Sequence, residues 1–273
     1  MKKRVLPFAS YNLWFLFASP VGKEEWHCDM KRGFTKARQN EPQVKALLKQ
    51  DNTHQRIGIL AQKGVYEFHQ DSRLLQQSNG VQRVADILQL NQESEEVQQR
   101  VISILSNYYN NAILGGKNII QLNRGDEGFP KPITIKQGSS CFDLYAPTDC
   151  IFTELDGTMH ILDFKTGKSN FDRRQAYVYL LAASYLYPQQ PAVASFYNLE
   201  NCSASEIITA NPEKLNFVQI ELAELAKKHE LEKISYGTRP EDFANIFPAN
   251  PGISCRYCTF NSICEFSLSE VYK

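Results

Sequence analysis

The sequence predicts an α/β or α+β fold in which helices flank a mixed β-sheet. Three observations support this class. The first third of the chain has helical periodicity, the middle is rich in strand-forming residues and turn signals, and a helix, a strand and another helix follow. A length of 273 residues suits one large domain. We expect a single domain over 1–273, with an N-terminal segment (1–40), a core carrying a helical insertion (50–245) and a tail (250–273).

The first third of the chain reads as a series of helices. Ser10 precedes an apolar run at 11–17 and is a suitable N-cap. Apolar residues recur at mixed three-and-four spacing over 41–75. The same spacing is clearer over 80–114, where it predicts two helices joined near Asn91.

The middle of the chain, residues 131–167, is rich in Ile, Phe, Thr and Tyr. Turn signals stand at Gly138, at Pro147 and at Asp156–Gly157, and Asp-Gly is a favoured two-residue hairpin turn. This stretch predicts a meander of strands. A helix over 172–187, a strand over 192–200 and an amphipathic helix over 211–234 are expected after it.

Composition limits where the protein works and what attracts its partners. Acidic and basic residues balance at 30 each, so nucleic acid would be bound by a local patch rather than by a global field. No apolar run is long enough to predict a membrane span. The seven cysteines are an odd number, and we expect no secretory signal, so a secreted disulfide framework is disfavoured. We therefore expect a cytoplasmic protein.

Two charged residues interrupt the apolar strand predicted over 159–165. Asp163 and Lys165 are two positions apart, so their side chains share one face of the strand. Counting outward from the Asp156–Gly157 turn brings Asp149 opposite Asp163, and cross-strand neighbours lie within about 5.5 Å. Two carboxylates at that distance repel each other unless a cation such as magnesium or manganese lies between them.

This arrangement predicts metal-assisted phosphodiester hydrolysis, with Lys165 close to the attacking water or the scissile phosphate. Two alternatives stay open. Asp163 and Lys165 could form an ordinary ion pair on an exposed strand face, which is the commoner role of such residues. Asp143 could replace Asp149, although Asp149 fits the hairpin count better.

The C-terminal tail contains a cysteine pattern with ligand spacing. Cys255, Cys258 and Cys264 follow a C-x2-C-x5-C order within ten residues. Three thiolates leave one ligand position open, which Cys28 or the adjacent His27 could complete. Thiolate ligands alone do not distinguish zinc from an iron–sulfur cluster.

Two basic stretches are candidates for contact with nucleic acid. Arg173 and Arg174 stand at the start of a predicted helix, close to Lys168, and suit contacts with backbone phosphates. The second stretch lies near the N-terminus, and a solvated surface explains it equally well. Its residues are Lys2, Lys3 and Arg4 of the "KKR" run, together with Lys31, Arg32, Lys36 and Arg38.

Together, these motifs resemble the RecB-type nucleases of the PD-(D/E)xK superfamily. More narrowly, the chain is similar to their iron–sulfur branch, which includes CRISPR-associated exonucleases and the AddB nuclease domain. Asp149 precedes the "DFKTG" run that contains Asp163 and Lys165, and the segment "QAYVY" matches the family's Q-x-x-x-Y signature with Gln175 and Tyr179. The C-x2-C-x5-C tail is also a feature of this branch.

The resemblance implies a restriction-endonuclease-like core with a C-terminal cysteine clasp. It implies a DNA nuclease, directed to single strands or ends as an exonuclease. Asp149 and Asp163 would hold Mg²⁺ or Mn²⁺, Lys165 would assist the attacking water, and Gln175 and Tyr179 would position the DNA backbone. A structural 4Fe-4S cluster would be held by Cys28, Cys255, Cys258 and Cys264, with zinc as the alternative. A DNA repair role and a helicase partner fit the family, but the residues identify neither.

One departure from the family concerns Gln62. In "RIGILAQKG", Gln62 stands where the family often has a metal-binding His in a G-x-x-x-H motif. We expect Gln62 to complete the site, since an amide can ligate or position a metal with its water, although less strongly than imidazole. Glu67 or His69 could compensate from further along the same helix. The alternative to an active nuclease is therefore a non-catalytic DNA-binding subunit that keeps the nuclease fold, with an iron–sulfur or zinc staple.

Overall fold

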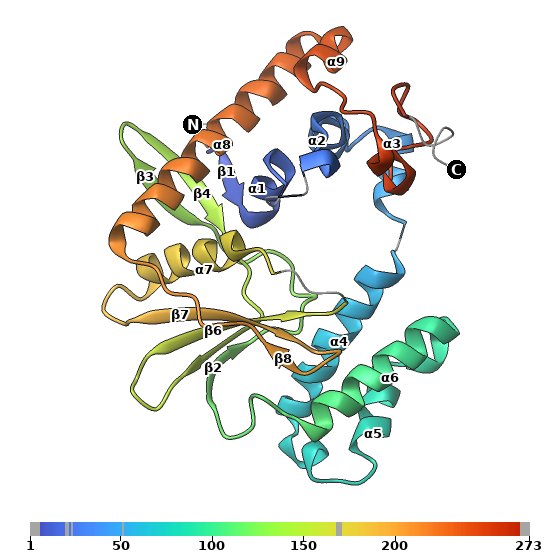
Figure 1. The fold of residues 1–273 in the computed structure, drawn as a ribbon, viewed down its shortest axis with the longest axis vertical. Coiled ribbons are helices and arrows are strands. Elements are labelled where there is room, and N and C mark those ends of the chain that lie inside the picture. Colours follow the sequence, from blue (N-terminus) through green and yellow to red (C-terminus); the bar gives the residue numbers. More distant parts are fainter. Residues whose placement is uncertain (1–5, 20–21, 23, 51, 168–170, 268–273) are drawn as a thin grey trace, which may run out of the picture. The chain divides into compact units, whose positions relative to one another are not determined.

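The structure is a computed structural model that describes residues 6–19, 22, 24–50, 52–167 and 171–267. The chain divides into two compact units (Figure 1). Unit 1 comprises 1–50, 132–145 and 217–273, and unit 2 comprises 51–131 and 146–216. The expectation of one domain over 1–273, with its three subdivisions, stays a prediction.

Unit 1 contains a three-stranded sheet in the order β1 (Phe8–Ser10), β4 (Ser140–Tyr145) and β3 (Ile133–Gln137). β1 pairs with β4 in parallel, and β3 with β4 antiparallel. The predicted N-cap is confirmed, because the Ser10 side chain accepts the backbone N–H of Leu13 at 3.1 Å. The helices of this unit are α1 (Tyr11–Phe17), η1 (Glu24–Trp26), α2 (Asp29–Lys36), α3 (Pro42–Leu48), η4 (Pro240–Asp242), α9 (Phe243–Ile246) and η5 (Ile253–Tyr257), together with most of α8 (Pro212–Thr238).

Unit 2 is built on a mixed five-stranded sheet. Its strand order is β2 (Asn118–Leu122), β5 (Cys150–Thr153), β6 (Met159–Lys165), β7 (Ala192–Asn198) and β8 (Ser203–Ala204). β6 and β7 are parallel, and the other neighbours are antiparallel. The helices are α4 (Thr53–Gln70), η2 (Ser72–Leu75), α5 (Gly80–Ile87), η3 (Leu90–Gln92), α6 (Glu95–Asn110) and α7 (Arg173–Leu186). The predicted class, a mixed sheet flanked by helices, is confirmed.

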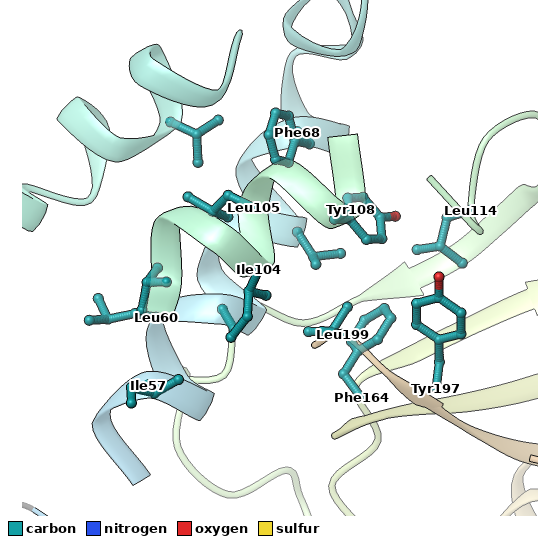
Figure 2. Close-up of a cluster of buried hydrophobic side chains, with 14 of the residues drawn as sticks. Ile57, Leu60, Phe68, Ile104, Leu105, Tyr108, Leu114, Phe164, Tyr197 and Leu199 are labelled. Carbon is teal, nitrogen blue, oxygen red and sulfur yellow. The ribbon is translucent and has the colours of Figure 1, made fainter. Parts of the chain in front are cut away.

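The unit 2 sheet has an apolar cluster on each face. Leu162 and Phe164 of β6 point into a cluster with α4, α5 and α6, part of which is drawn in Figure 2. Met159 and Ile161 of the same strand point into a second cluster, with α7. Successive strand residues thus alternate between two buried faces, and Asp163 continues the series that faces α7.

Two expectations needed correction. The strands of 131–167 do not form one meander, because β4 pairs with β1 whereas β5 is paired on both edges, by β2 and β6. The predicted helix over 211–234 is present as α8, but apolar residues lie on two of its faces instead of one. Within the described parts of the chain, no helix is long and apolar enough to cross a membrane.

Candidate active site

The β5–β6 hairpin brings two carboxylates together. Its register pairs Cys150 with Leu162 and Ile151 with Ile161, so one further step places Asp149 opposite Asp163. Ile151 and Ile161 both belong to the α7 cluster. Because side chains two residues apart share a face, both aspartates lie on the α7 side of the sheet. The two aspartates are therefore opposite each other as expected, although the hairpin loop has three residues, Leu155, Asp156 and Gly157, and is not the predicted two-residue Asp-Gly turn.

Asp163 lies at the centre of a buried hydrogen-bond network. Its side chain is almost fully buried, with the residue 2% exposed. Its Oδ1 accepts the Tyr179 hydroxyl at 2.6 Å and the Gln175 Nε2 at 2.8 Å. Among the described residues, no donor meets its Oδ2 with hydrogen-bond geometry, although the Lys165 ammonium is in ion-pair contact with that atom. This oxygen therefore keeps lone-pair capacity for another ligand.

Asp149 is held by two donors from different elements. Its Oδ1 accepts the Gln62 Nε2 from α4 at 3.1 Å, and its Oδ2 accepts the backbone N–H of Phe164 at 2.7 Å. Burial raises the pKa of Asp149, and the negative charge of Asp163 raises it further, against the opposing effect of Lys165. Because the two carboxylates repel, a cation between them would stabilise the ionised pair.

Helix α7 supplies the remaining polar side chains. It begins after Asp172, whose carboxylate accepts the backbone N–H of Arg174 at 3.0 Å as an N-cap. One turn separates Gln175 from Tyr179, so both face the end of β6. Gln175 accepts the Lys165 ammonium at 2.9 Å and donates to the Tyr179 hydroxyl at 2.6 Å. Burial, and then the charge of Asp163, raise the pKa of Tyr179, which keeps its hydroxyl protonated as a donor.

Sequence reasoning missed two residues that support this site. The backbone carbonyl of Asn123 accepts the Gln62 amide at 3.2 Å, and the Asn123 side chain donates to the Thr148 carbonyl at 2.6 Å. Gly125 has φ +91°, and a Cβ there would lie 2.8 Å from the Gln62 side chain. The only sequence signal was a polar, glycine-containing turn after β2, which does not reveal what it packs against.

A comparison with protein families shows which family the chain belongs to. The PD-(D/E)XK nuclease superfamily profile matches residues 36–265. The chain belongs to the PD-(D/E)XK nuclease superfamily. Membership implies nuclease activity on a nucleic acid substrate, and PD-(D/E)XK nucleases typically use a divalent metal ion.

The other comparisons add little to this. No curated protein matches the chain significantly. Among solved structures, the crystal structure of SSO0001 aligns over 76% of this chain and 94% of its own length, at 14% identity and a TM-score of 0.31. A similarity this low supports no argument about fold or function.

The residues present fit the divalent metal of PD-(D/E)XK nucleases. Asp149 and Asp163 offer hard carboxylate oxygens from adjacent strands, and the Asp163 Oδ2 lacks a hydrogen-bond donor among the described residues. Among the described residues, neither this site nor any other groups three His, Cys, Asp or Glu side chains closely enough to hold a metal ion. A bound ion would therefore take its other ligands from water or substrate.

The alternative site residues lie elsewhere. Asp143 is on β4 of the unit 1 sheet, where its carboxylate accepts the Thr134 hydroxyl at 2.7 Å. His69 contacts the Tyr108 hydroxyl at 2.6 Å in the unit 2 core, and Glu67 pairs with Arg124 at 3.4 Å. None of the three joins the Asp149–Asp163 group.

The predicted basic stretches are largely engaged in ion pairs. Arg173 pairs with Glu206, and Arg174 pairs with Asp172 at 2.5 Å. Lys168, and Lys2, Lys3 and Arg4 of the "KKR" run, lie outside the described residues. In the N-terminal stretch, Arg32 is fully buried. Its predicted place on a basic surface is wrong, because acidic partners draw its guanidinium inward.

The four cysteines of the predicted cluster line one cavity in unit 1, of about 270 Å³. Cys28 precedes α2, Cys255 lies within η5, Cys258 directly follows η5, and Cys264 lies in the turns after it. Burial raises the pKa of the Cys258 and Cys264 thiols. They do not form a metal-binding group in the described chain, so the predicted cysteine clasp stays a prediction.

Proposed function

We propose that this nuclease is a metal-dependent DNA exonuclease that acts on single strands or on free ends. The observation that carries the proposal is the meeting of two carboxylates and one amine at the end of β6. A binding surface alone has no need of two repelling acids beside the place where a phosphate would sit. The preference for DNA ends comes from the resemblance to RecB-type exonucleases.

Each side chain has a distinct role in the proposed reaction. A divalent cation bound by Asp149 and Asp163 would supply charge stabilisation at the scissile phosphate and lower the pKa of the attacking water. Lys165 orients the water and offsets developing negative charge. Gln175 holds the Lys165 ammonium, while Tyr179 fixes one oxygen of Asp163. Gln62 orients Asp149 through its amide N–H.

The test of hydrolysis is cleavage of labelled DNA with Mg²⁺ or Mn²⁺ by the native chain and by Lys165→Ala. We expect the variant to lose about 10²- to 10³-fold in rate, as when a charge-stabilising donor is removed. Lys117→Ala is the matched control, because Lys117 also pairs with a carboxylate, Glu154 at 2.7 Å, at the other end of β5. Equal cleavage by native chain and Lys165→Ala would refute the mechanism.

End preference is tested separately with linear and circular single-stranded DNA of the same sequence. An exonuclease degrades the linear form and leaves the circle intact. A single-stranded RNA of the same sequence tests whether the enzyme cleaves DNA in preference to RNA. Cleavage of the circle would refute the exonuclease proposal without affecting the hydrolysis proposal.

A second candidate is a DNA-binding subunit that does not cleave. Gln62 favours it, because the amide donates to Asp149 where many relatives of RecB type have a metal-binding His. Tight DNA binding without cleavage under any metal ion or end structure would support this candidate. A gain of cleavage in Gln62→His would then identify the missing ligand as the reason.

Arg173 and Arg174 remain our candidates for contacts to the DNA backbone, together with Lys168. The Arg173–Glu206 pair is well exposed, so it contributes little to stability and a phosphate could replace the Glu206 carboxylate. Arg173→Ala should weaken DNA binding uniformly across sequences and reduce its salt dependence. Unchanged salt dependence would remove Arg173 from the binding surface.

We also propose that Cys28, Cys255, Cys258 and Cys264 hold a 4Fe-4S cluster with a structural role. Their position around one cavity supports this proposal, as does the C-x2-C-x5-C spacing. Anaerobic purification should give a brown protein with bound iron, and Cys258→Ser should lose both colour and iron, whereas Cys141→Ser should keep them. A colourless protein with stoichiometric zinc would support the zinc alternative instead.

A further inference from the structure

Helix α8 carries large apolar residues that stay exposed on the side opposite its buried face. Its buried face is formed by Val218, Leu222, Ala226 and His229. A helix that packs against its own chain on one side is normally polar on the other. On α8, four large apolar side chains stay exposed: Phe217 (52%), Ile220 (39%), Leu231 (55%) and Ile234 (57%).

Together with the exposed Glu224 and Lys227, these four residues form one continuous stripe, which we call the α8 stripe. Its positions are spaced by three and four residues, the repeat of a coiled-coil seam. Its members are Phe217, Ile220, Glu224, Lys227, Leu231 and Ile234. From end to end the stripe is about 26 Å long, at 1.5 Å per residue. The pattern therefore fits an approach by a second helix along most of α8.

The two charged members of the stripe point to the identity of that helix. Glu224 and Lys227 are both exposed at its centre, and neither forms an ion pair with another described residue. A partner helix must place opposite charges at these positions, and an apolar partner would bury both charges unpaired.

The α8 stripe is complementary to itself when two copies run antiparallel. A two-fold axis between positions 225 and 226 places Glu224 opposite Lys227 of the second copy, and Lys227 opposite Glu224. The same axis pairs Ile220 with Leu231, and Phe217 with Ile234, on both sides of this centre. A parallel pair would instead place Glu224 against Glu224 and Lys227 against Lys227, which is unfavourable.

We propose that two copies of this chain associate through the α8 stripe as an antiparallel two-helix coiled coil. Apolar pairs supply the affinity, and the two central Glu–Lys pairs fix the register and the direction. The seam is short compared with standard protein interfaces, so we expect a dissociation constant in the micromolar range. The proposal is independent of the nuclease activity.

Charge exchange tests the proposal by sedimentation equilibrium of the full chain from nanomolar to high micromolar concentration. Glu224→Lys creates two Lys–Lys contacts in its own dimer, and Lys227→Glu creates two Glu–Glu contacts. Each variant alone should dissociate at least about tenfold more readily than the native chain. An equimolar mixture of the two variants restores opposite charges at both central positions, so it should associate like the native chain.

The double variant Glu224→Lys/Lys227→Glu should also associate, because the antiparallel pairing survives the exchange. Glu241→Lys is the matched control: it makes the same charge change at an exposed position outside α8 and should leave association unchanged. Circular dichroism verifies that every variant is folded. A native chain that stays monomeric throughout, or single variants that dimerise as well as the native chain, would overturn the proposal.

Discussion

The Gln62 side-chain amide lies 3.1 Å from the Asp149 Oδ1 and donates a hydrogen bond to it. The same nitrogen also donates to the backbone carbonyl of Asn123 at 3.2 Å. One side chain of α4 therefore joins the loop after β2 to the first acid of the candidate site. In this structure Gln62 faces Asp149 with a hydrogen-bond donor, which holds the orientation of the carboxylate.

The first prediction concerns Gly125, which packs against Gln62. An alanine Cβ would approach the Gln62 side chain to 2.8 Å and push it away from Asp149. We expect Gly125→Ala to lower the cleavage rate about as much as Gln62→Ala does. The loss should be about 10- to 100-fold, as is typical when a contact that supports a metal site is removed. Initial rates on labelled DNA at saturating Mg²⁺ measure the effect.

A control variant, Gly128→Ala, separates the effect of the contact with Gln62 from the effect of backbone strain. Gly128 also has positive φ, +83°, but a Cβ there would meet nothing within 4 Å. Gly128→Ala should therefore cost stability through strain alone and leave the cleavage rate unchanged. Equal loss of activity in both glycine variants would show that the loop conformation matters and the Gln62 contact does not.

The second prediction concerns metal binding at Asp149. The carboxylate is destabilised by burial and by the charge of Asp163; Asp149→Asn removes this repulsion but leaves one acceptor oxygen for the two donors, the Gln62 amide and the Phe164 N–H. The native chain should gain stability when Mn²⁺ is added, since a ligand that binds only the folded state stabilises it. Asp149→Asn should lose this gain, as measured by differential scanning calorimetry and by titration calorimetry.

Asp143→Asn is the control for the metal experiment. Asp143 lies on β4 of unit 1 and bonds Thr134, so this variant should keep the full response to Mn²⁺. A lost response in Asp143→Asn with a normal response in Asp149→Asn would move the metal site to the other acid.

Local patterns made the hairpin and its acids predictable. The turn was found at the predicted place, but its loop has three residues, Leu155, Asp156 and Gly157, instead of the two expected, and this length brings Asp149 opposite Asp163. Ser10 was predictable as an N-cap for the same reason, because its partner Leu13 is three residues away. Contacts between nearby residues follow from backbone geometry that the sequence pattern carries.

Contacts between distant residues were not predictable in this way. The parallel pairing of β1 with β4 joins segments more than a hundred residues apart and takes β4 out of the expected meander. Arg32 looked like part of a basic surface because Glu232, its main partner, lies 200 residues away. The Asn123 support for Gln62 was not predictable either, since its contact uses a backbone carbonyl.

The third prediction concerns buried Arg32. Its guanidinium pairs with Glu232 and, at 2.7 Å, with Asp29, and it stacks 3.9 Å from the Phe17 ring centre. Arg32→Ala leaves the largely buried Glu232 without its main cation, so unit 1 should lose about 3–5 kcal/mol of unfolding free energy. Both tryptophans of the chain, Trp14 and Trp26, lie in unit 1, so tryptophan fluorescence in urea reports on this unit.

Arg38→Ala is the control for Arg32. Arg38 pairs with Glu41 at 2.6 Å, but both side chains are about one-third exposed. Its loss should cost about 1 kcal/mol or less, as for other surface pairs. Similar unfolding midpoints for the two variants would contradict the role of burial.

The fourth prediction concerns the pH dependence of unit 1 stability, through His229 of α8. Its side chain is 1% exposed and packs against the rings of Phe8 and Phe17. Burial lowers the pKa of His229 from 6.5 to about 4, and the nearby positive charges of Lys233, Lys36 and Arg32 act in the same direction.

The sign of the pH effect follows from this lowered pKa. Above about pH 6.5, His229 is neutral in both states and adds no pH dependence. As the pH falls from 6.5 towards 4, the unfolded chain binds a proton that the folded chain does not, so unit 1 loses stability, by on the order of 3 kcal/mol in total.

His229→Phe should reduce the slope of unfolding free energy against pH, because it removes the titrating group and keeps an aromatic ring. Urea unfolding followed by tryptophan fluorescence measures this slope. His54→Gln, at an exposed position of unit 2, should leave the slope as it is. An unchanged slope in His229→Phe would assign the acid sensitivity of unit 1 to other groups.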